Sequence, residues 1–256
     1  MPTELLILRH RQIQQGQRNK NRKEKLYTIP INDAFHEDCE CPLCAMYHQL
    51  EEDALRLTMA GYMVDDQRME SNQTGFCEKH IQMLLARQDR LGVALMLNTH
   101  METVIRNLEG HKPEMVKKTL FGKVKETGNP VTNYTEQVSE SCFVCDKIQA
   151  IFQQYLKTIC YLYKKEADFR QTLLSAKGFC TKHYGMLYRA GIEELGGKVQ
   201  ESFLTDITTL YIENMKRVKE DLDWYIQKYD YRFKDEPWKN AKDAVERSLV
   251  KLNSIY

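Results

Sequence analysis

The feature that most constrains the fold is a set of metal-ligand residue types that occurs twice in the same order. A Cys-x-x-Cys pair, Cys41 and Cys44, is followed by a Cys-x-x-His pair, Cys77 and His80. The same order returns 101 to 103 residues later in these four residues: Cys142, Cys145, Cys180 and His183. Because both pairs recur with only two residues of drift, the pattern predicts a tandem duplication.

Three cysteines and one histidine in each half are the donor set of a closed zinc site. Two residues between ligands allow a tight turn to direct both side chains at one ion. Where such a pair opens a helix, its members share one face, and the positive end of the helix dipole favours the thiolate form. The sequence therefore predicts two structural zinc ions per chain, with both kinds of pair at helix starts.

The distance that the chain can span favours a metal site made by the two pairs of the same half, provided that the chain turns back between them. The helix expected after Cys44 has about 16 residues and a length of roughly 24 Å. Residues 62–76 can cover the return, either extended or as a short antiparallel helix. We expect each half to be a helical hairpin held at its base by metal. A pairing across halves, in which the first Cys-x-x-Cys pair shares an ion with Cys180 and His183, stays open.

Other chemistries fit the cysteine pattern less well. An iron–sulfur cluster normally takes four thiolates, so the histidine in each half counts against it. A thiol-dependent redox site is the other alternative, since a Cys-x-x-Cys pair at a helix start can have a lowered thiol pKa. A c-type haem is disfavoured because neither Cys44 nor Cys145 is followed by His. Four protein ligands leave no open position for a catalytic zinc, and the sequence offers no catalytic residue set.

Hydrophobic periodicity predicts an all-α fold, and no alternating strand pattern competes with it. The expected helical segments are 45–60, 81–108, 148–165 and 184–229. We expect the second to bend near Gly92 and the last to break at Gly196-Gly197.

The composition of the chain predicts an organisation in five parts. Gly, Pro and polar residues indicate a linker between the halves. The C-terminal region is aromatic, with Trp224, Trp238 and several tyrosines. We interpret that region as a cap over the helices, with a partner surface as the alternative. The parts are a disordered basic leader (1–25), the first zinc-binding repeat (26–108), the linker (109–141), the second zinc-binding repeat (142–218) and a C-terminal helical extension (219–256).

The formal net charge of +1 is unevenly distributed. Residues 1–25 hold seven Lys or Arg against two Glu, which leaves 30 basic and 34 acidic residues in 26–256. Binding to nucleic acid would therefore depend on the leader. The sequence otherwise identifies no partner, although a protein partner fits a binding or scaffold module, and the oligomeric state stays open.

Hydropathy and cysteine usage indicate the cellular compartment. No run of about 18 apolar residues is present, which excludes a membrane span. The first residues lack the pattern of a secretory signal, so we expect a cytoplasmic protein. In that compartment the eight cysteines favour metal binding over disulfides.

A short acid–base motif recurs with the ligands, as Asp66-x-Arg68 and Asp168-x-Arg170. Each arginine precedes the Cys of its own Cys-x-x-His pair by nine or ten residues. We expect it to donate to a thiolate or to a backbone carbonyl beside the ligands. The alternative is a solvated surface pair, worth under about 1 kcal/mol.

Three further residues fall outside the repeat, and of these Cys39 is the alternative to Cys41 as a ligand, which the repeat disfavours. Cys39 has no cysteine counterpart in the second half, and Cys160 corresponds to an apolar Met59. We expect Cys160 to be an inert buried thiol. We interpret His100 as a packed or solvent-facing histidine.

Several segments between 25 and 256 together resemble an uncharacterised family of clostridial and related anaerobic bacteria, known as a domain of unknown function. The resemblance implies no activity, cofactor or mechanism, and it implies that natural members begin near Lys25. The segments are Tyr27-Thr-Ile-Pro-Ile, Cys41-Pro-Leu-Cys44, Tyr62-Met-x-Asp-Asp-x-Arg68, Gly75-Phe-Cys-x-Lys-His80, Leu95-Met-Leu-Asn-Thr-His100, Tyr229-Asp-Tyr-Arg232 and Pro237-Trp238.

Overall fold

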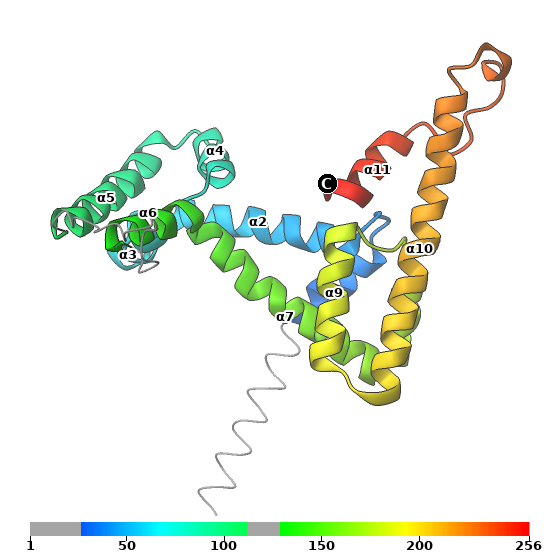
Figure 1. Cartoon of the computed structure of the whole chain (residues 1–256), viewed down its shortest axis with the longest axis horizontal. Helices are drawn as coiled ribbons and strands as arrows, with labels where there is room; N and C mark the ends of the chain where they lie inside the picture. Colours follow the sequence, from blue (N-terminus) through cyan, green and yellow to red (C-terminus); the bar gives the residue numbers. More distant parts are fainter. Residues whose placement is uncertain (1–26, 112–128, 256) are drawn as a thin grey trace, which may run out of the picture. The chain divides into compact units, whose positions relative to one another are not determined.

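The computed structural model describes residues 27–111 and 129–255, and the regular elements in these ranges are all helices (Figure 1). This confirms the predicted all-α class. The expected leader lies outside the described residues. Residues 27–36 are helical, and the elements after them are α2 (Pro42–Gly61), α3 (Asp65–Thr74), α4 (Glu78–Ala86), α5 (Arg90–Glu109), α6 (Pro130–Glu140), α7 (Phe143–Lys165), α8 (Ala167–Ser175), α9 (Thr181–Glu194), α10 (Gly197–Gln227), η1 (Tyr231–Phe233) and α11 (Ala244–Asn253).

The same order of helices follows each Cys-x-x-Cys pair. A long helix, α2 or α7, begins directly after the first cysteine of the pair and contains the second, and a short helix, α3 or α8, comes next. The Cys-x-x-His pair then opens α4 or α9, and a second long helix, α5 or α10, ends the series. The first three helices of the second half begin 101 to 103 residues after their counterparts, as the ligand pairs do.

The single helix predicted over 81–108 is wrong, because the chain forms two helices there. The first, α4, ends at Ala86, and α5 begins at Arg90. Gln88 between them has a positive φ of 65°, which does not continue a helix. The Asp89 side chain then accepts a hydrogen bond from the Gly92 amide at 2.9 Å and caps α5. Gly92 therefore lies at a helix start and not at a bend.

The linker predicted over 109–141 is also partly wrong, because α6 occupies residues 130–140. The Asn129 side chain accepts a hydrogen bond from the Val131 amide at 2.9 Å, and Pro130 occupies the first turn. An Asn-Pro pair therefore starts a helix here, in the usual capping arrangement. Residues 112–128 lie outside the described part of the chain.

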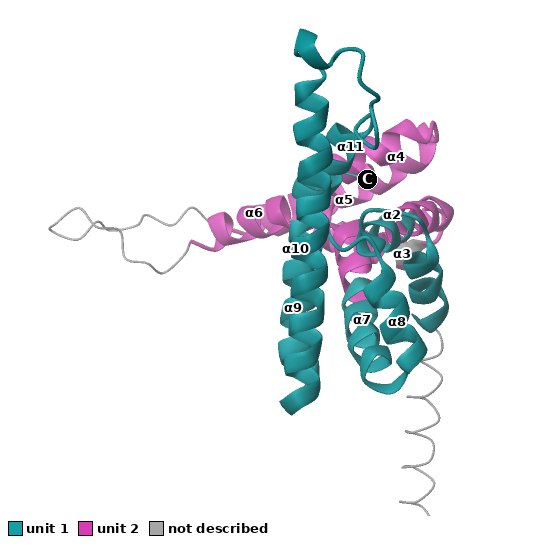
Figure 2. Cartoon of the chain, turned by 90° about the vertical axis from the view of Figure 1, so that its right-hand side faces the viewer, with its two compact units in different colours: residues 1–49, 152–256 teal, residues 50–151 magenta. Residues whose placement is uncertain are grey.

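The structure divides the chain into two compact units, which Figure 2 distinguishes by colour. Unit 1 consists of Met1–Gln49 and Phe152–Tyr256, and unit 2 consists of Leu50–Ile151. This division differs from the predicted succession of repeats. The long helix α2 begins in unit 1 and ends in unit 2, while α7 begins in unit 2 and ends in unit 1.

Each unit has its own apolar core. In unit 1, α9 and α10 form a helical hairpin against which α11 packs (Figure 1). Phe152, Phe179 and Phe203 are fully buried there. In unit 2, α3, α4 and α6 contact α5 or one another, and Leu55 and Leu84 are fully buried.

The aromatic residues of the C-terminal extension pack on one another at the end of α10. The Trp224 indole N–H donates to the Pro237 carbonyl at 3.0 Å, and the Lys239 ammonium lies 3.9 Å from the Trp224 ring centroid. Tyr229 and Tyr231 are exposed. In the described ranges, no helix is both long and apolar enough to cross a membrane.

Candidate metal centres

The eight predicted ligands gather into two clusters. Within each cluster, the candidate ligand atoms all lie within 4.8 Å of one another. Site 1 lies in unit 1 and contains Cys41, Cys44, Cys180 and His183; site 2 lies in unit 2 and contains Cys77, His80, Cys142 and Cys145. Each Cys-x-x-Cys pair thus meets the Cys-x-x-His pair of the other half. The predicted pairing within each half is wrong, and the structure has the alternative pairing across halves.

The long helices explain this exchange. Cys41 directly precedes α2, which carries the chain out of unit 1 and into unit 2. The short helix α3 follows there, so the chain reaches Cys77 without returning to unit 1. In the second half, α7 carries the chain from unit 2 into unit 1 in the same way. Pairing within a half required the chain to turn back between its two pairs, and the chain does not do so.

In site 1, three separations between donor atoms are close to those of ligands around one tetrahedral ion. The Sγ atoms of Cys44 and Cys180 are 3.6 Å apart. His183 Nδ1 lies 3.3 Å from Cys44 Sγ and 3.7 Å from Cys41 Sγ. Two sulfur ligands at about 2.3 Å from a tetrahedral zinc ion are about 3.8 Å apart. All four side chains are buried, with at most 3% exposed.

Site 2 places three sulfur atoms around one imidazole nitrogen. His80 Nδ1 lies 3.3 Å from each of the Sγ atoms of Cys77, Cys142 and Cys145. The Sγ atoms of Cys77 and Cys145 are 4.0 Å apart. His80 and Cys142 are buried, whereas Cys77 and Cys145 are half-buried. This site has the same donor set as site 1 but is more open to solvent.

Both kinds of pair lie at helix starts, as the sequence predicts. Cys41 and Cys142 directly precede α2 and α7, while Cys77 and Cys180 are the N-cap residues of α4 and α9. The Cys180 sulfur accepts a hydrogen bond from the His183 amide at 3.4 Å. Helix-start amides and the helix dipole therefore favour negative charge at the sulfur atoms.

The glycine of each Gly-Phe-Cys segment adopts a backbone conformation that side chains rarely allow. Gly75 has φ +65° and Gly178 has φ +83°. A Cβ atom on Gly75 would lie 2.7 Å from His100 Nε2, and one on Gly178 would lie 3.0 Å from Asn214 Cβ. Glycine thus permits the turn that leads into each Cys-x-x-His pair. His100 belongs to neither cluster, and its Nδ1 lies 2.9 Å from the Asn72 carbonyl oxygen.

Two hydrogen bonds join the segment before Cys77 to the residues on either side of Cys142 in site 2. The Phe143 amide donates to the Gly75 carbonyl at 2.9 Å, and the Ser141 hydroxyl donates to the Thr74 carbonyl at 2.7 Å. In site 1, Pro42 occupies the position that corresponds to Phe143. Proline has no N–H group, so the equivalent backbone bond cannot form.

A buried lysine from α11 makes the corresponding connection in site 1. The Lys251 ammonium donates to the Glu40 carbonyl at 2.7 Å and to the Lys177 carbonyl at 2.5 Å. These carbonyls belong to the segments that lead into Cys41 and Cys180. Only 1% of Lys251 is exposed, and sequence reasoning missed it because no local pattern marks a lysine of an amphipathic helix as buried.

Lys251 also belongs to a buried group of charges. Its ammonium lies 3.1 Å from Glu40 Oε2, to which the Arg217 guanidinium donates at 2.5 Å. Burial lowers the pKa of Lys251, and the Glu40 carboxylate opposes that shift. The Ser254 hydroxyl lies 3.1 Å from Cys180 Sγ, in position to donate to it. The hydroxyl thus contacts a ligand sulfur directly, whereas the two cationic groups contact the segments that carry the ligands.

A carboxylate supports the histidine of site 2. Glu51 Oε1 accepts from His80 Nε2 at 3.1 Å and from the Lys79 ammonium at 2.5 Å, with 4% of Glu51 exposed. Burial would raise the pKa of Glu51, but the hydrogen bonds from Lys79 and His80 lower it. A proton held on Nε2 leaves the Nδ1 lone pair free toward the cysteines. Sequence reasoning missed Glu51, which lies in the acidic run 51–53.

The histidine of site 1 has a different environment. His183 Nε2 is buried and has no hydrogen-bond partner among the described residues. The ring centroids of Phe152 and Tyr47 lie 5.2 Å and 6.0 Å from the His183 ring. The two imidazoles therefore present Nδ1 in the same way, but only that of site 2 has a carboxylate behind it.

The thiol pKa values differ within and between the two clusters. Burial raises the pKa of Cys41 to about 12 and that of Cys145 to about 12. Burial also opposes ionisation of Cys142, but hydrogen bonds, first from His80, lower its pKa to about 6. Hydrogen bonds from Cys41 and Cys44 lower the pKa of Cys180. Burial thus opposes ionisation of Cys41 and Cys145, whereas hydrogen bonds favour the thiolates of Cys142 and Cys180, and a bound cation would favour ionisation of every cysteine around it.

Arg170 does not make the contact expected from the recurring motif. Its guanidinium donates to Asp206 Oδ2 and to Ser202 Oγ, both at 2.8 Å, and lies 4.8 Å from the Tyr163 ring centroid. These partners lie on α10 and α7, because α8 presents Arg170 to those helices. Asp168 is exposed in the first turn of α8. These contacts join α8 to α7 and α10 within unit 1, and none of them involves a candidate ligand.

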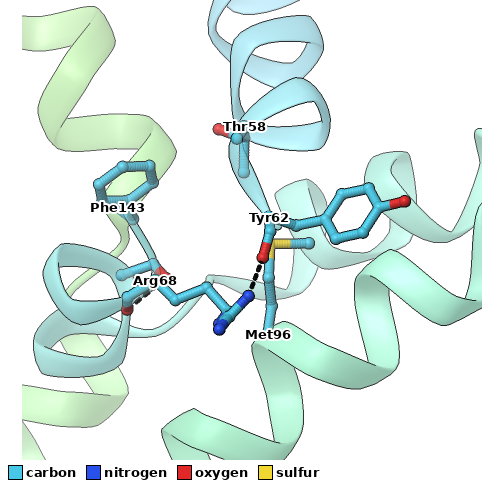
Figure 3. A pocket seen from close by; sticks show the side chains of 7 residues that line it. Thr58, Tyr62, Arg68, Met96 and Phe143 are labelled. Carbon is cyan, nitrogen blue, oxygen red and sulfur yellow. Dashed lines mark hydrogen bonds between the residues drawn. The ribbon is translucent and has the colours of Figure 1, made fainter. Parts of the chain in front are cut away.

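Arg68 likewise contacts the end of a helix. Its guanidinium donates to the Tyr62 carbonyl just after α2, as Figure 3 shows. Asp66 is exposed in α3. The contact with Tyr62 closes the turn between α2 and α3, so it differs from the predicted contact with a thiolate or a carbonyl beside Cys77.

The two remaining cysteines belong to neither cluster. Cys160 is fully buried, and burial raises the pKa of its thiol to about 12, which agrees with the predicted inert thiol. Cys39 is half-buried, and burial raises its pKa to about 11.

Comparisons with known proteins give one relationship. A family model described as a family of unknown function matches residues 22–256. No curated protein and no solved structure matches the chain significantly.

Proposed function

We propose that this chain, which belongs to the family of unknown function DUF6062, binds two structural zinc ions and serves as a binding or scaffold module. The observation that carries the proposal is the pair of clusters, each with three cysteines and one histidine within 4.8 Å. These donors are the ones that a closed, tetrahedral zinc site uses. The clusters lack the open position that catalysis requires, so we infer a role other than catalysis at the metal.

The proposed ions would stabilise the fold by joining distant parts of the chain. Site 1 joins Cys44 to Cys180, which are 136 residues apart, and site 2 joins Cys77 to Cys145, 68 residues apart. Metal binding that closes such loops becomes part of the free energy of folding. We also propose that the halves are a tandem duplication whose ligand pairs are exchanged, which the shared helix order supports.

A thiol-dependent redox protein is the second candidate, and site 2 favours it. Cys77 and Cys145 are half-buried, and the pKa of Cys142 is lowered to about 6, although burial opposes ionisation. Reactive thiols combine a low pKa with access to solvent, and here the two properties fall on neighbouring residues, because Cys142 itself is buried. An iron–sulfur cluster would use the same residues but normally prefers four thiolates.

One measurement separates these candidates. The full chain, purified without oxygen, is analysed for metals and by visible absorption. We expect two zinc ions per chain and no visible absorption band, because zinc is colourless. Visible bands with iron would establish the iron–sulfur alternative, and a folded protein with no metal would leave the redox alternative.

Single substitutions assign the ions to their sites. We expect Cys77→Ser to lose the ion of site 2 and His183→Ala to lose the ion of site 1, each with a lower melting temperature. Cys39→Ser is the matched control, since Cys39 is half-buried and lies outside both clusters. A melting curve unchanged by the first two variants would contradict a structural role for the ions.

We propose the cytoplasm as the compartment, because a reducing environment keeps cysteine ligands free of disulfides. A protein partner fits the scaffold role. Binding to nucleic acid would rest on the basic residues of 1–25.

A further inference from the structure

The two clusters differ in access to solvent although their donors are the same. In site 1, the most exposed ligand is Cys44, at 3%. In site 2, Cys77 and Cys145 are half-buried, while His80 and Cys142 are buried. An oxidant in solution can therefore approach two sulfur atoms of site 2 more readily than any sulfur atom of site 1.

The helix α11 explains why site 1 is closed. The Ser254 hydroxyl, just after this helix, lies 3.1 Å from Cys180 Sγ. One turn earlier, Lys251 joins the two segments that lead into the ligand pairs. Any opening of site 1 must break these contacts. Site 2 is instead tied through the hydrogen bond from Phe143 to Gly75, which leaves the outer face of its cysteines accessible.

The accessible sulfur atoms are also neighbours. Cys77 Sγ and Cys145 Sγ are 4.0 Å apart, on segments 68 residues apart in sequence. A disulfide requires about 2.05 Å between the sulfur atoms, with Cα atoms usually within about 7 Å. The two sulfur atoms would have to approach each other by about 2 Å to form this bond.

We propose that Cys77 and Cys145 form a hydroperoxide-sensitive modification site, oxidised before any cysteine of site 1. In the first step, one thiolate attacks a peroxide oxygen and forms a sulfenic acid while hydroxide leaves. In the second, the other thiolate attacks the sulfenic sulfur, and the disulfide forms as a second hydroxide leaves. Together the two thiolates lose two electrons, and these electrons reduce one molecule of hydrogen peroxide to two hydroxide ions. This inference rests on the proposed zinc binding.

The consequence would be confined to unit 2. A disulfide between Cys77 and Cys145 removes two of the four ligands of site 2, so zinc is released there. Site 1 keeps all four ligands and its ion. Oxidation would then loosen the unit that holds α3 to α6 while unit 1 stays folded.

The experiment uses the zinc-loaded full chain without substitutions. Its metal content is measured first, and it is then treated with hydrogen peroxide in the presence of a chromogenic zinc chelator. Free thiols are alkylated at each time, and peptide masses identify the oxidised cysteines. We expect one zinc ion per chain to be released early, together with a disulfide between Cys77 and Cys145, while the cysteines of site 1 remain reduced.

The outcomes separate this inference from the proposed function. A chain that binds no zinc before oxidation would contradict the proposed function itself. Two ions released at the same rate, or earlier oxidation of Cys41 or Cys180, would overturn the inference while leaving zinc binding intact. Cys39 is the internal control, since it is also half-buried but lies in no cluster. Oxidation of Cys39 as fast as that of Cys77 would show that exposure alone decides the rate, and it would overturn the proposed site.

Discussion

Replacing Lys251 with methionine tests whether a buried ammonium from α11 holds site 1 together. The side chain is 1% exposed, and its ammonium donates to two carbonyls and pairs with Glu40. Methionine fills most of the aliphatic volume of lysine, so the substitution chiefly removes the charge and the donors. The carbonyls of Glu40 and Lys177 then lose a buried partner.

The expected loss of stability follows from these contacts. Removing one partner of a buried ion pair typically costs about 3–5 kcal/mol, because the other charge stays buried. Arg217 still pairs with Glu40 at 2.5 Å, which keeps the expected loss near the lower end, about 3 kcal/mol. Site 2 has no part in this connection, so its ion is the internal reference.

Two assays measure the effect on the zinc-loaded protein. Urea unfolding followed by circular dichroism gives the loss of stability, and competition with a chelator gives zinc retention at each site. In the Lys251→Met variant, we expect the ion of site 1 to be released sooner, while the rate of release from site 2 stays unchanged. The double variant Glu40→Gln, Lys251→Met should lose about 1–2 kcal/mol less than the sum of the single variants, since the two groups interact directly. A loss under about 1 kcal/mol with unchanged zinc release, or strict additivity, would refute the reasoning.

Three further predictions follow from individual contacts. Glu51→Gln should weaken zinc retention at site 2 by about 10- to 100-fold in chelator competition, because the carboxylate that orients His80 is lost; equal retention would contradict that role. Arg170→Ala should lower stability by at most about 1 kcal/mol, because its pair with Asp206 is partly exposed, and keep both ions; loss of zinc would restore the predicted role at the ligands. Cys160 should resist alkylation in the folded chain at pH 8, since a pKa of about 12 leaves about one thiolate in ten thousand; the rate should rise with pH, and rapid labelling at pH 8 would show that the thiol is accessible.

The sequence by itself determined the donors and the class of fold. Eight residues at two fixed spacings defined two sets of three cysteines and one histidine, and these are the residues that cluster. Apolar periodicity defined helices, and Gly196-Gly197 marked a break that the structure has between α9 and α10. These properties are local, because they depend on residues within one or two helical turns of each other.

Only the tertiary structure decided which pairs share a site. Cys44 is 33 residues from Cys77 and 136 from Cys180, and closing the longer loop costs only about 1.3 kcal/mol more. Such a difference is too small to select a partner, so the direction in which α2 leaves site 1 selects it. The sequence did not predict the roles of Lys251 and Glu51 either, because each contacts residues beside a ligand or a ligand itself that lie far away in the chain or on another helix. Their roles depend on packing between segments, and spacing along the chain does not contain that information.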